Sequence, residues 1–164
     1  MDTLQYCTPQ WLKECKKRYD ENSALQVKLK KISRKMVFLV TADPAWGIDE
    51  DIYFCSFFDA GKLLKLELIS PQTAADEADY ILEGTPQEWV DILRKKTKFI
   101  ARFMMQEIKL PQGEKVDVLS LAPYANDLVD VLALPELQYP DELTPEQLEA
   151  YRADMHAFRS EMDI

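Results

Sequence analysis

The chain has 164 residues, the size of a single compact domain, and its 47% hydrophobic and 30% charged residues are typical of a globular protein rather than a disordered or collagen-like one. Its 20 Lys and Arg residues against 29 Asp and Glu residues give a net charge of -9, which argues against nucleic acid as a partner of the whole molecule. Four glycines and one histidine are too few for several familiar kinds of active site.

Nothing in the sequence indicates export or insertion into a membrane. Residues 1–12 contain no basic residue and no long apolar stretch, so the parts of a secretory signal are missing. The longest near-continuous apolar run, residues 36–42, is much shorter than the roughly 20 residues that span a bilayer. Cys7, Cys15 and Cys55 lack Cys-x-x-Cys spacing and fit reduced thiols. We therefore expect a cytoplasmic protein without stable membrane insertion.

Three helix starts share one signal, a threonine followed directly by a proline. Thr8, Thr85 and Thr144 can each cap free backbone amides, and proline at the next position loses nothing by lacking an amide hydrogen. Glu88 and Gln147 complete capping boxes at the second and third starts. These signals predict helices over about 9–20, from 86 onward, and over 145 to about 162.

Between the first two helices, β-branched and aromatic residues alternate with turn residues, a pattern typical of an antiparallel meander. In one segment Leu64, Leu66 and Leu68 alternate with Lys65 and Glu67, which predicts a sheet with one buried and one wet face. The predicted strands cover residues 36–42, 51–58, 63–69 and 78–84, with a fifth at 108–110.

The C-terminal half is predicted to be helical. From Phe99 to Met105 only Arg102 is polar, so this helix must be covered on two sides as a core helix or must line an apolar cavity. A further helix carries apolar residues between 121 and 132. The last helix has one apolar stripe and an acidic remainder, and it can dock on the domain or on a partner.

No motif for catalysis or metal binding stands out. The four glycines are far apart, so no phosphate-binding loop is formed by the sequence. The only imidazole, His156, lies on the polar last helix and is predicted to be a solvated surface histidine. Three scattered cysteines and one histidine do not supply a zinc or iron site. The acidic runs 49–51 and 141–142 are predicted to be solvated loop charges, and we expect no catalytic residue, no metal and no cofactor.

The order of motifs resembles the sterol carrier protein 2 family of lipid-binding domains. The resemblance rests on a strand with an Ala-Asp start (78–85), a helix with a conspicuous tryptophan (89–93), a Phe-Met-rich helix (99–104) and a last strand (108–110). It covers roughly residues 36–134. The family usually has glycine after the tryptophan helix and before the final strand, where this chain has Arg94-Lys95-Lys96 and Gln106-Glu107.

This resemblance implies an α+β fold, with a five-stranded, mostly antiparallel sheet and helices packed on one face around an apolar cavity or tunnel. It also implies a lipid-binding domain, which we expect at 1–140. The C-terminal helix at 141–164 lies outside the common pattern of the family, and we expect it to dock on the domain or on a partner. Each candidate lining residue also fits a plain core position. The candidates are Phe38, Phe54, Trp89, Leu93, Phe99, Phe103, Met104, Leu121, Tyr124 and Leu128.

Three functions stay open at this point. The first, which the resemblance favours, is non-catalytic binding and intracellular transfer of a lipid such as a sterol, fatty acid or fatty acyl derivative. The second is an accessory or scaffold protein that docks a partner, or forms a homodimer, through its apolar surface and C-terminal helix. The third, an enzyme acting on a lipophilic substrate, is disfavoured by the missing base and metal ligands.

Overall fold

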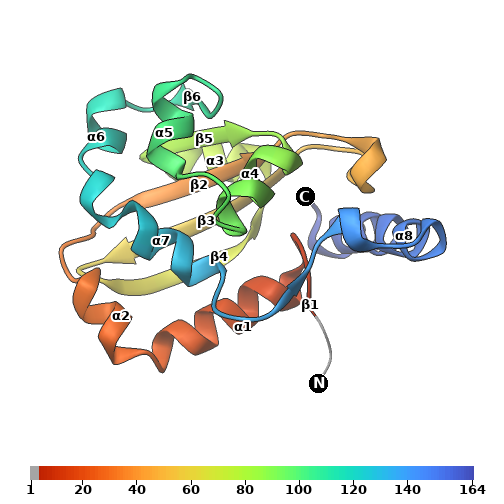
Figure 1. The fold of residues 1–164 in the computed structure, drawn as a ribbon, viewed down its shortest axis with the longest axis horizontal. Helices are drawn as coiled ribbons and strands as arrows, with labels where there is room; N and C mark the ends of the chain where they lie inside the picture. The colour runs from red at the N-terminus through yellow and green to blue at the C-terminus, as the bar shows by residue number, and fades with distance from the viewer. Residues whose placement is uncertain (1–3) are drawn as a thin grey trace.

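The computed structural model describes residues 4–164, which form an open five-stranded sheet in the order β4-β3-β2-β5-β6 and a separate two-stranded sheet (Figure 1). The α+β fold class is confirmed. In the larger sheet β2 and β5 are parallel, and the other neighbours are antiparallel. The strands are β1 (Leu4–Gln5), β2 (Lys35–Val40), β3 (Ile52–Asp59), β4 (Lys62–Ile69), β5 (Tyr80–Gly84), β6 (Lys109–Gln112) and β7 (Leu137–Gln138).

The three helix starts predicted from Thr-Pro pairs are confirmed, and each threonine accepts a hydrogen bond from a backbone amide of the first turn. Two further helices, α3 and α6, were not predicted. Ser70 caps α3 before Pro71, so α3 begins with a close variant of the same signal. The helices are α1 (Pro9–Asp20), α2 (Ser23–Lys28), α3 (Pro71–Glu77), α4 (Pro86–Leu93), α5 (Phe99–Met104), α6 (Lys115–Leu119), α7 (Ala125–Leu132) and α8 (Pro145–Met162).

The sheet separates two hydrophobic cores of unequal size. Helices α1, α4, α5 and α7 lie over one face and share the main core with it (Figure 1). The opposite face carries a smaller cluster that includes Val37 and Cys55 and is covered by Ala74 of α3. The prediction of a wet face is therefore wrong for the centre of the sheet and holds only toward the edge strand β4, where Lys65 and Glu67 are exposed.

Strand β4 contains a β-bulge, and for this reason the predicted alternation of Leu64, Leu66 and Leu68 is wrong at one residue. Leu66 and Leu68 are buried as expected, whereas Leu64 is 50% exposed. The pairing of β3 with β4 shifts between Phe57 and Phe58, so Leu64 is left over and Leu63 takes the inward position. An extra residue in one strand reverses the faces of all residues beyond it, and a strictly alternating pattern does not reveal it.

Helix α8 docks on the domain rather than extending freely from it. The hydroxyl of Tyr151 donates a hydrogen bond to the carbonyl oxygen of Tyr6, and Tyr151 and Met155 are buried. Tyr6 directly follows β1, which pairs in parallel with β7 in the connector before α8. The start of the described chain, the connector and α8 therefore form one packed corner.

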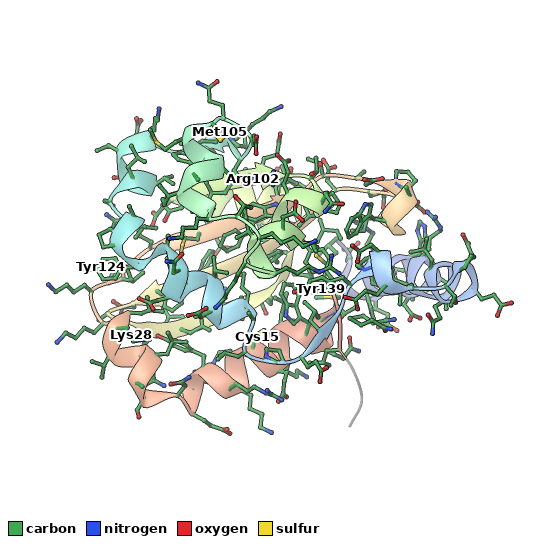
Figure 2. All side chains as sticks on the ribbon, viewed as in Figure 1. Cys15, Lys28, Arg102, Met105, Tyr124 and Tyr139 are labelled. Atoms are coloured by element: carbon green, nitrogen blue, oxygen red, sulfur yellow. The ribbon has the colours of Figure 1, made fainter. Side chains whose placement is uncertain are left out.

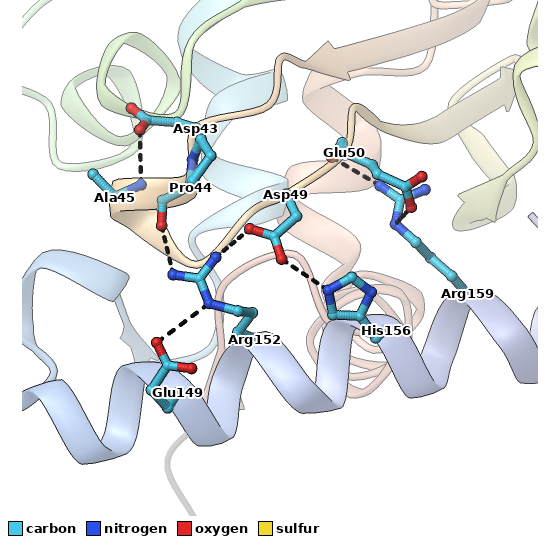
Figure 3. A network of polar contacts seen from close by, with 9 residues as sticks. All are labelled: Asp43, Pro44, Ala45, Asp49, Glu50, Glu149, Arg152, His156 and Arg159. Atoms are coloured by element: carbon cyan, nitrogen blue, oxygen red, sulfur yellow. Dashed lines mark hydrogen bonds and ion pairs between the residues drawn. The ribbon is translucent and has the colours of Figure 1, made fainter.

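A row of polar contacts also joins α8 to the acidic loop at 49–51 (Figure 3). Arg152 pairs with Asp49 and donates to the carbonyl of Pro44 at 2.8 Å. His156 Nε2 lies 2.8 Å from Asp49 Oδ2, and Arg159 donates to the carbonyl of Glu50 at 2.9 Å. The prediction of solvated charges holds for Glu50 and Asp51, which are exposed, and is wrong for Asp49, which is partly buried and paired. His156 is half-exposed but paired rather than fully solvated.

Candidate functional site

An apolar cavity of about 50 Å³ lies between the main face of the sheet and the helices above it. The sheet wall contributes Met36 and Phe38 from β2, Phe54 from β3 and Leu82 from β5. Successive strand residues point to opposite faces, so this wall comes from every second residue of β2. Tyr6, next to β1, closes one part of the wall.

The helical wall comes from four short helices. Trp89, Ile92 and Leu93 of α4 share one helix face, and Phe99 comes from the first turn of α5. The remaining wall is aliphatic and belongs to α6, α7 and the segment between them. It consists of Val118, Leu121, Ala125, Leu128, Val129 and Leu132.

Seven of the ten residues predicted to bind a ligand line this cavity. They are Phe38, Phe54, Trp89, Leu93, Phe99, Leu121 and Leu128. Phe103 is buried in the core with its ring centroid 6.0 Å from that of Phe99, and Tyr124 is partly buried against the core at the start of α7 (Figure 2). Neither of these two side chains lines the cavity.

Met104, the third outlying candidate, is 52% exposed, and Met105 is 69% exposed. Figure 2 shows Met105 at the outer end of α5. Successive side chains of an α-helix are rotated by about 100° around its axis. A helix that points Phe99 and Phe103 toward the core therefore points Met104 away from it. The expectation that this apolar helix is covered on two sides is therefore wrong.

Trp89 is fixed in the cavity wall by the sheet beneath it. Its indole Nε1 donates a hydrogen bond of 3.1 Å to the carbonyl oxygen of Leu39. This close approach requires a glycine at position 84, since a Cβ there would lie 3.0 Å from the Trp89 Nε1 atom and 2.7 Å from Cδ1 of Ile108. The capping box of Thr85 and Glu88 sets the start of α4 and with it the direction of the tryptophan.

A continuous chain of aromatic rings runs along the cavity. Neighbouring ring centroids are between 5.1 and 6.2 Å apart, within the range of favourable aromatic packing. The chain therefore gives the cavity two distinct ends, one beside α1 and one beside α5. In order, the rings are Tyr6, Trp11, Phe54, Phe38, Trp89 and Phe99.

The α5 end of the cavity adjoins a more polar depression of about 200 Å³. The two share Ile92, Phe99 and Val129 as lining residues. Across the depression, Lys95 Nζ lies 2.6 Å from Asp130 Oδ1, and this ion pair joins the loop after α4 to α7. Both members of this ion pair line the depression, which adjoins the cavity at the three shared residues.

The same C-terminal turn of α7 is also held by α1. Trp11 Nε1 donates to the carbonyl of Leu132 at 3.0 Å, and Arg18 donates to the carbonyl of Leu134 at 3.0 Å. The first of these bonds is buried. Because the bond from α1 is buried and the Lys95–Asp130 pair is exposed to water, the ion pair is the weaker of these two attachments of α7.

The residues that this structure describes offer little for catalysis. Burial raises the pKa of the three cysteine thiols, to about 11 for Cys55, so the thiols are protonated at neutral pH. Within residues 4–164 no three His, Cys, Asp or Glu side chains gather in a group that could hold a metal ion. None of the described helices is both long enough and apolar enough to cross a membrane.

No family model and no curated protein matches the chain in sequence. Among solved structures, a crystal structure of sterol carrier protein 2 is similar with a TM-score of 0.70 and 18% identity, covering 80% of this chain and 99% of that one. A conserved hypothetical protein from Thermus thermophilus, described as possibly a sterol carrier protein, is similar with a TM-score of 0.69 and 18% identity, covering 84% of this chain and 94% of that one. Sterol carrier protein 2 from Yarrowia lipolytica in its apo form has a TM-score of 0.51 and 14% identity, covering 77% of this chain and 88% of that one.

These identities are low, so the likeness concerns the arrangement of the backbone. It confirms the resemblance noted from the motifs at 78–110 as a resemblance of fold. The chain has the sterol carrier protein 2 fold, and its apolar cavity lies between the sheet and the helices of that fold.

Proposed function

We propose that the protein binds a lipid in the apolar cavity and carries it within the cell without catalysing a reaction. The observation that carries this proposal is the cavity wall, whose fifteen residues include no charged side chain. An apolar pocket with few polar groups is the usual form of a site for a hydrophobic small molecule. The fold that the chain shares with proteins named sterol carriers supports the same assignment.

A lipid of ordinary size requires the cavity to widen. Ligand pockets usually measure about 300–1,000 Å³, whereas this cavity measures about 50 Å³. Each methylene group that leaves water contributes about 0.8 kcal/mol, so an acyl chain supplies enough free energy to displace a wall held by weak contacts. Helix α7 is the wall we expect to move, about its buried attachment to α1 and away from the loop that carries Lys95.

The absence of catalysis is also part of this proposal. A reaction would need a base or nucleophile beside the bound ligand, and Tyr6 carries the one ionisable group among the described residues that line the cavity. Burial raises the pKa of this hydroxyl, which keeps it neutral and makes it a poor base. The histidine lies on α8, where it pairs with Asp49. The scaffold alternative has less support, because α8 turns Tyr151 and Met155 into its own domain.

Lipid binding is testable with the full chain and a matched pair of variants. We expect native mass spectrometry to show a one-to-one complex after incubation with a fluorescent fatty acyl probe, and unlabelled lipid to displace that probe. Ala125→Leu fills the cavity and should weaken binding at least tenfold, whereas Ala101→Leu makes the same change at an exposed position of α5 and should not. No complex with any lipid, or equal effects of the two variants in folded protein, would overturn the proposal.

Carriage between membranes needs its own measurement. Donor vesicles loaded with the probe should lose it to acceptor vesicles faster when the protein is present, and Ala125→Leu should remove this acceleration. Charge reversal at Asp154 and Glu161, which are exposed on α8, separates the proposal from the scaffold alternative. A scaffold that uses this helix should lose its partner or its dimer, whereas a carrier should keep its lipid transfer.

A further inference from the structure

The tyrosine at the α1 end of the cavity carries an unpaired polar group. Tyr6 is 1% exposed, and its hydroxyl has no hydrogen-bond partner. The thiol of Cys7 lies near but is a weak acceptor. Leaving a buried hydroxyl unpaired costs about 1–3 kcal/mol, so such a group calls for an explanation.

Tyr6 also carries the one side-chain hydroxyl among the described residues of the cavity wall, and in the narrow cavity this hydroxyl is covered by its neighbours until a ligand widens the space. The indole of Trp89, the other polar group in the wall, is engaged by the carbonyl of Leu39. Every other lining side chain is a hydrocarbon or a thioether. A ligand that enters past Phe99 with a polar group at its leading end meets only apolar surface until it reaches Tyr6.

The position of Tyr6 is fixed by contacts outside the cavity. Its carbonyl accepts a hydrogen bond from Tyr151 of α8, and its ring packs against Trp11 and Tyr139 at centroid distances of 5.5 and 5.9 Å. Burial, with a smaller contribution from Cys7, raises the pKa of the Tyr6 hydroxyl. The hydroxyl is therefore neutral at physiological pH and can donate one hydrogen bond or accept one.

A ligand with a charged end would find no oppositely charged side chain in the described cavity wall near Tyr6. An ionised carboxylate that leaves water needs cations or several donors, and burying it without them costs far more than burying a hydroxyl. Arg94 lies behind this end, over the Tyr139 ring, but it does not line the cavity and is paired with Asp141 and Glu142. Arg159 acts on Cys7 and does not line the cavity either. Lys95 and Lys98 line the depression at the opposite, α5 end. One tyrosine hydroxyl satisfies an alcohol or a carbonyl oxygen but not an anion.

We propose that Tyr6 recognises a neutral hydroxyl or carbonyl group on the bound lipid, so that the cavity selects lipids with an uncharged polar end over carboxylates of the same chain length. This inference rests on the proposed lipid binding and adds the chemical class of the ligand and its orientation, polar end toward α1. The chain provides a matched control in Tyr80, which also has a buried, unpaired hydroxyl but does not line the cavity.

The test compares decan-1-ol with decanoate at pH 7.5 by titration calorimetry of the full chain. We expect the wild type to bind decan-1-ol at least tenfold more tightly than decanoate. Tyr6→Phe should weaken decan-1-ol about tenfold and leave decanoate unchanged, whereas Tyr80→Phe should change neither. Decanoate binding as tight as decan-1-ol binding and lost in Lys98→Gln, or decan-1-ol binding unchanged in Tyr6→Phe, would overturn the inference while leaving lipid binding intact.

A second readout needs no ligand. Because the Tyr6 hydroxyl makes no hydrogen bond, Tyr6→Phe should leave the melting temperature of the free protein unchanged or higher. A fall in that temperature would show that the hydroxyl is already paired and would contradict the inference. Failure of every lipid to bind the wild type would instead remove the proposed function, and this inference with it.

Discussion

The indole nitrogen of Trp89 donates a hydrogen bond to the backbone carbonyl of Leu39, and this bond ties a tryptophan of α4 to the central strand β2. The ring then lies edge-on to Phe38 and parallel to Phe99, at interplanar angles of 89° and 8°. One hydrogen bond thus places three rings of the cavity wall. The side chain of Leu39 lies on the opposite face of the sheet, in the smaller core, and only its backbone carbonyl takes part in this contact.

Gly84→Ala should disturb this arrangement. The added Cβ would lie 2.7 Å from Ile108 Cδ1 and 3.0 Å from Trp89 Nε1, so the end of the Ile108 side chain must move and the tryptophan must shift slightly. We expect a loss of about 1–3 kcal/mol in the free energy of unfolding, measured with urea. The indole NMR signal of Trp89 should move while those of Trp11 and Trp46 stay in place. An unmoved Trp89 signal would contradict the contact.

Asp130→Asn should loosen α7 beside the depression without unfolding the protein. The Lys95–Asp130 pair is exposed, so its loss should cost at most about 1 kcal/mol of stability. Stopped-flow release of a fluorescent acyl probe should become several-fold faster, because α7 loses its tie across the depression. Asp127→Asn, one turn earlier in α7 and facing Lys28, serves as the control and should not change the rate. Equal rates in all three proteins would show that the pair does not limit release.

Gln106→Gly should stabilise the protein. Lys95 and Gln106 both adopt left-handed backbone conformations with φ of 62°, at the two places where the sterol carrier protein 2 family usually has glycine. In this conformation a residue with a Cβ lowers the free energy of unfolding by about 1–2 kcal/mol. Glycine avoids this cost, and its greater freedom in the unfolded chain offsets only part of the gain. Urea denaturation should show a gain of about 0.5–1 kcal/mol in the free energy of unfolding. Gln87→Gly, in the regular helix α4, should show a loss instead.

Local signals were sufficient to predict much of this fold. Thr8, Thr85 and Thr144 mark helix starts because a cap acts through residues three or four positions away. The side of the sheet on which Phe38 and Phe54 lie follows from alternation within single strands. Both kinds of signal are contained in a few consecutive residues, and so they can be read without knowledge of the fold.

What the sequence does not reveal depends on contacts between distant segments. Tyr6 reaches the cavity because β1 pairs with β7, which lies near the other end of the chain, and no local pattern reports this pairing. That Leu64 is an extra, unpaired residue can be recognised only from the pairing of β4 with its partner strand β3. Met104 was misplaced for another reason, since hydrophobicity alone does not fix which side of a six-residue helix faces inward.

Asp141→Asn should reduce stability at neutral pH and have less effect in acid. Arg94 forms two hydrogen bonds to Asp141, of 2.6 and 2.7 Å, and these hold the pKa of the carboxyl below its ordinary value of 3.8. A lowered pKa stabilises the fold above pH 3.8, and that contribution disappears as the pH falls through the lowered value. We expect a loss of about 1 kcal/mol at about pH 6 that shrinks below about pH 4, measured with urea, since Asp141 is partly exposed. An exposed control, Asp59→Asn, should show no such pH dependence.

Tyr151→Phe should weaken the docking of α8 more than the loss of any one ion pair on its polar side. Tyr151 is buried, and without its hydroxyl the carbonyl of Tyr6 has no donor, which costs about 1–3 kcal/mol. Arg152→Gln removes ion pairs to Asp49 and Glu149 and a hydrogen bond to a backbone carbonyl, all near the surface, and should cost about 1 kcal/mol or less. Hydrogen exchange of the α8 amides should accelerate strongly in the first variant and slightly in the second. The reverse order would mean that the charges at 49–51, rather than the buried tyrosine, hold α8 on the domain.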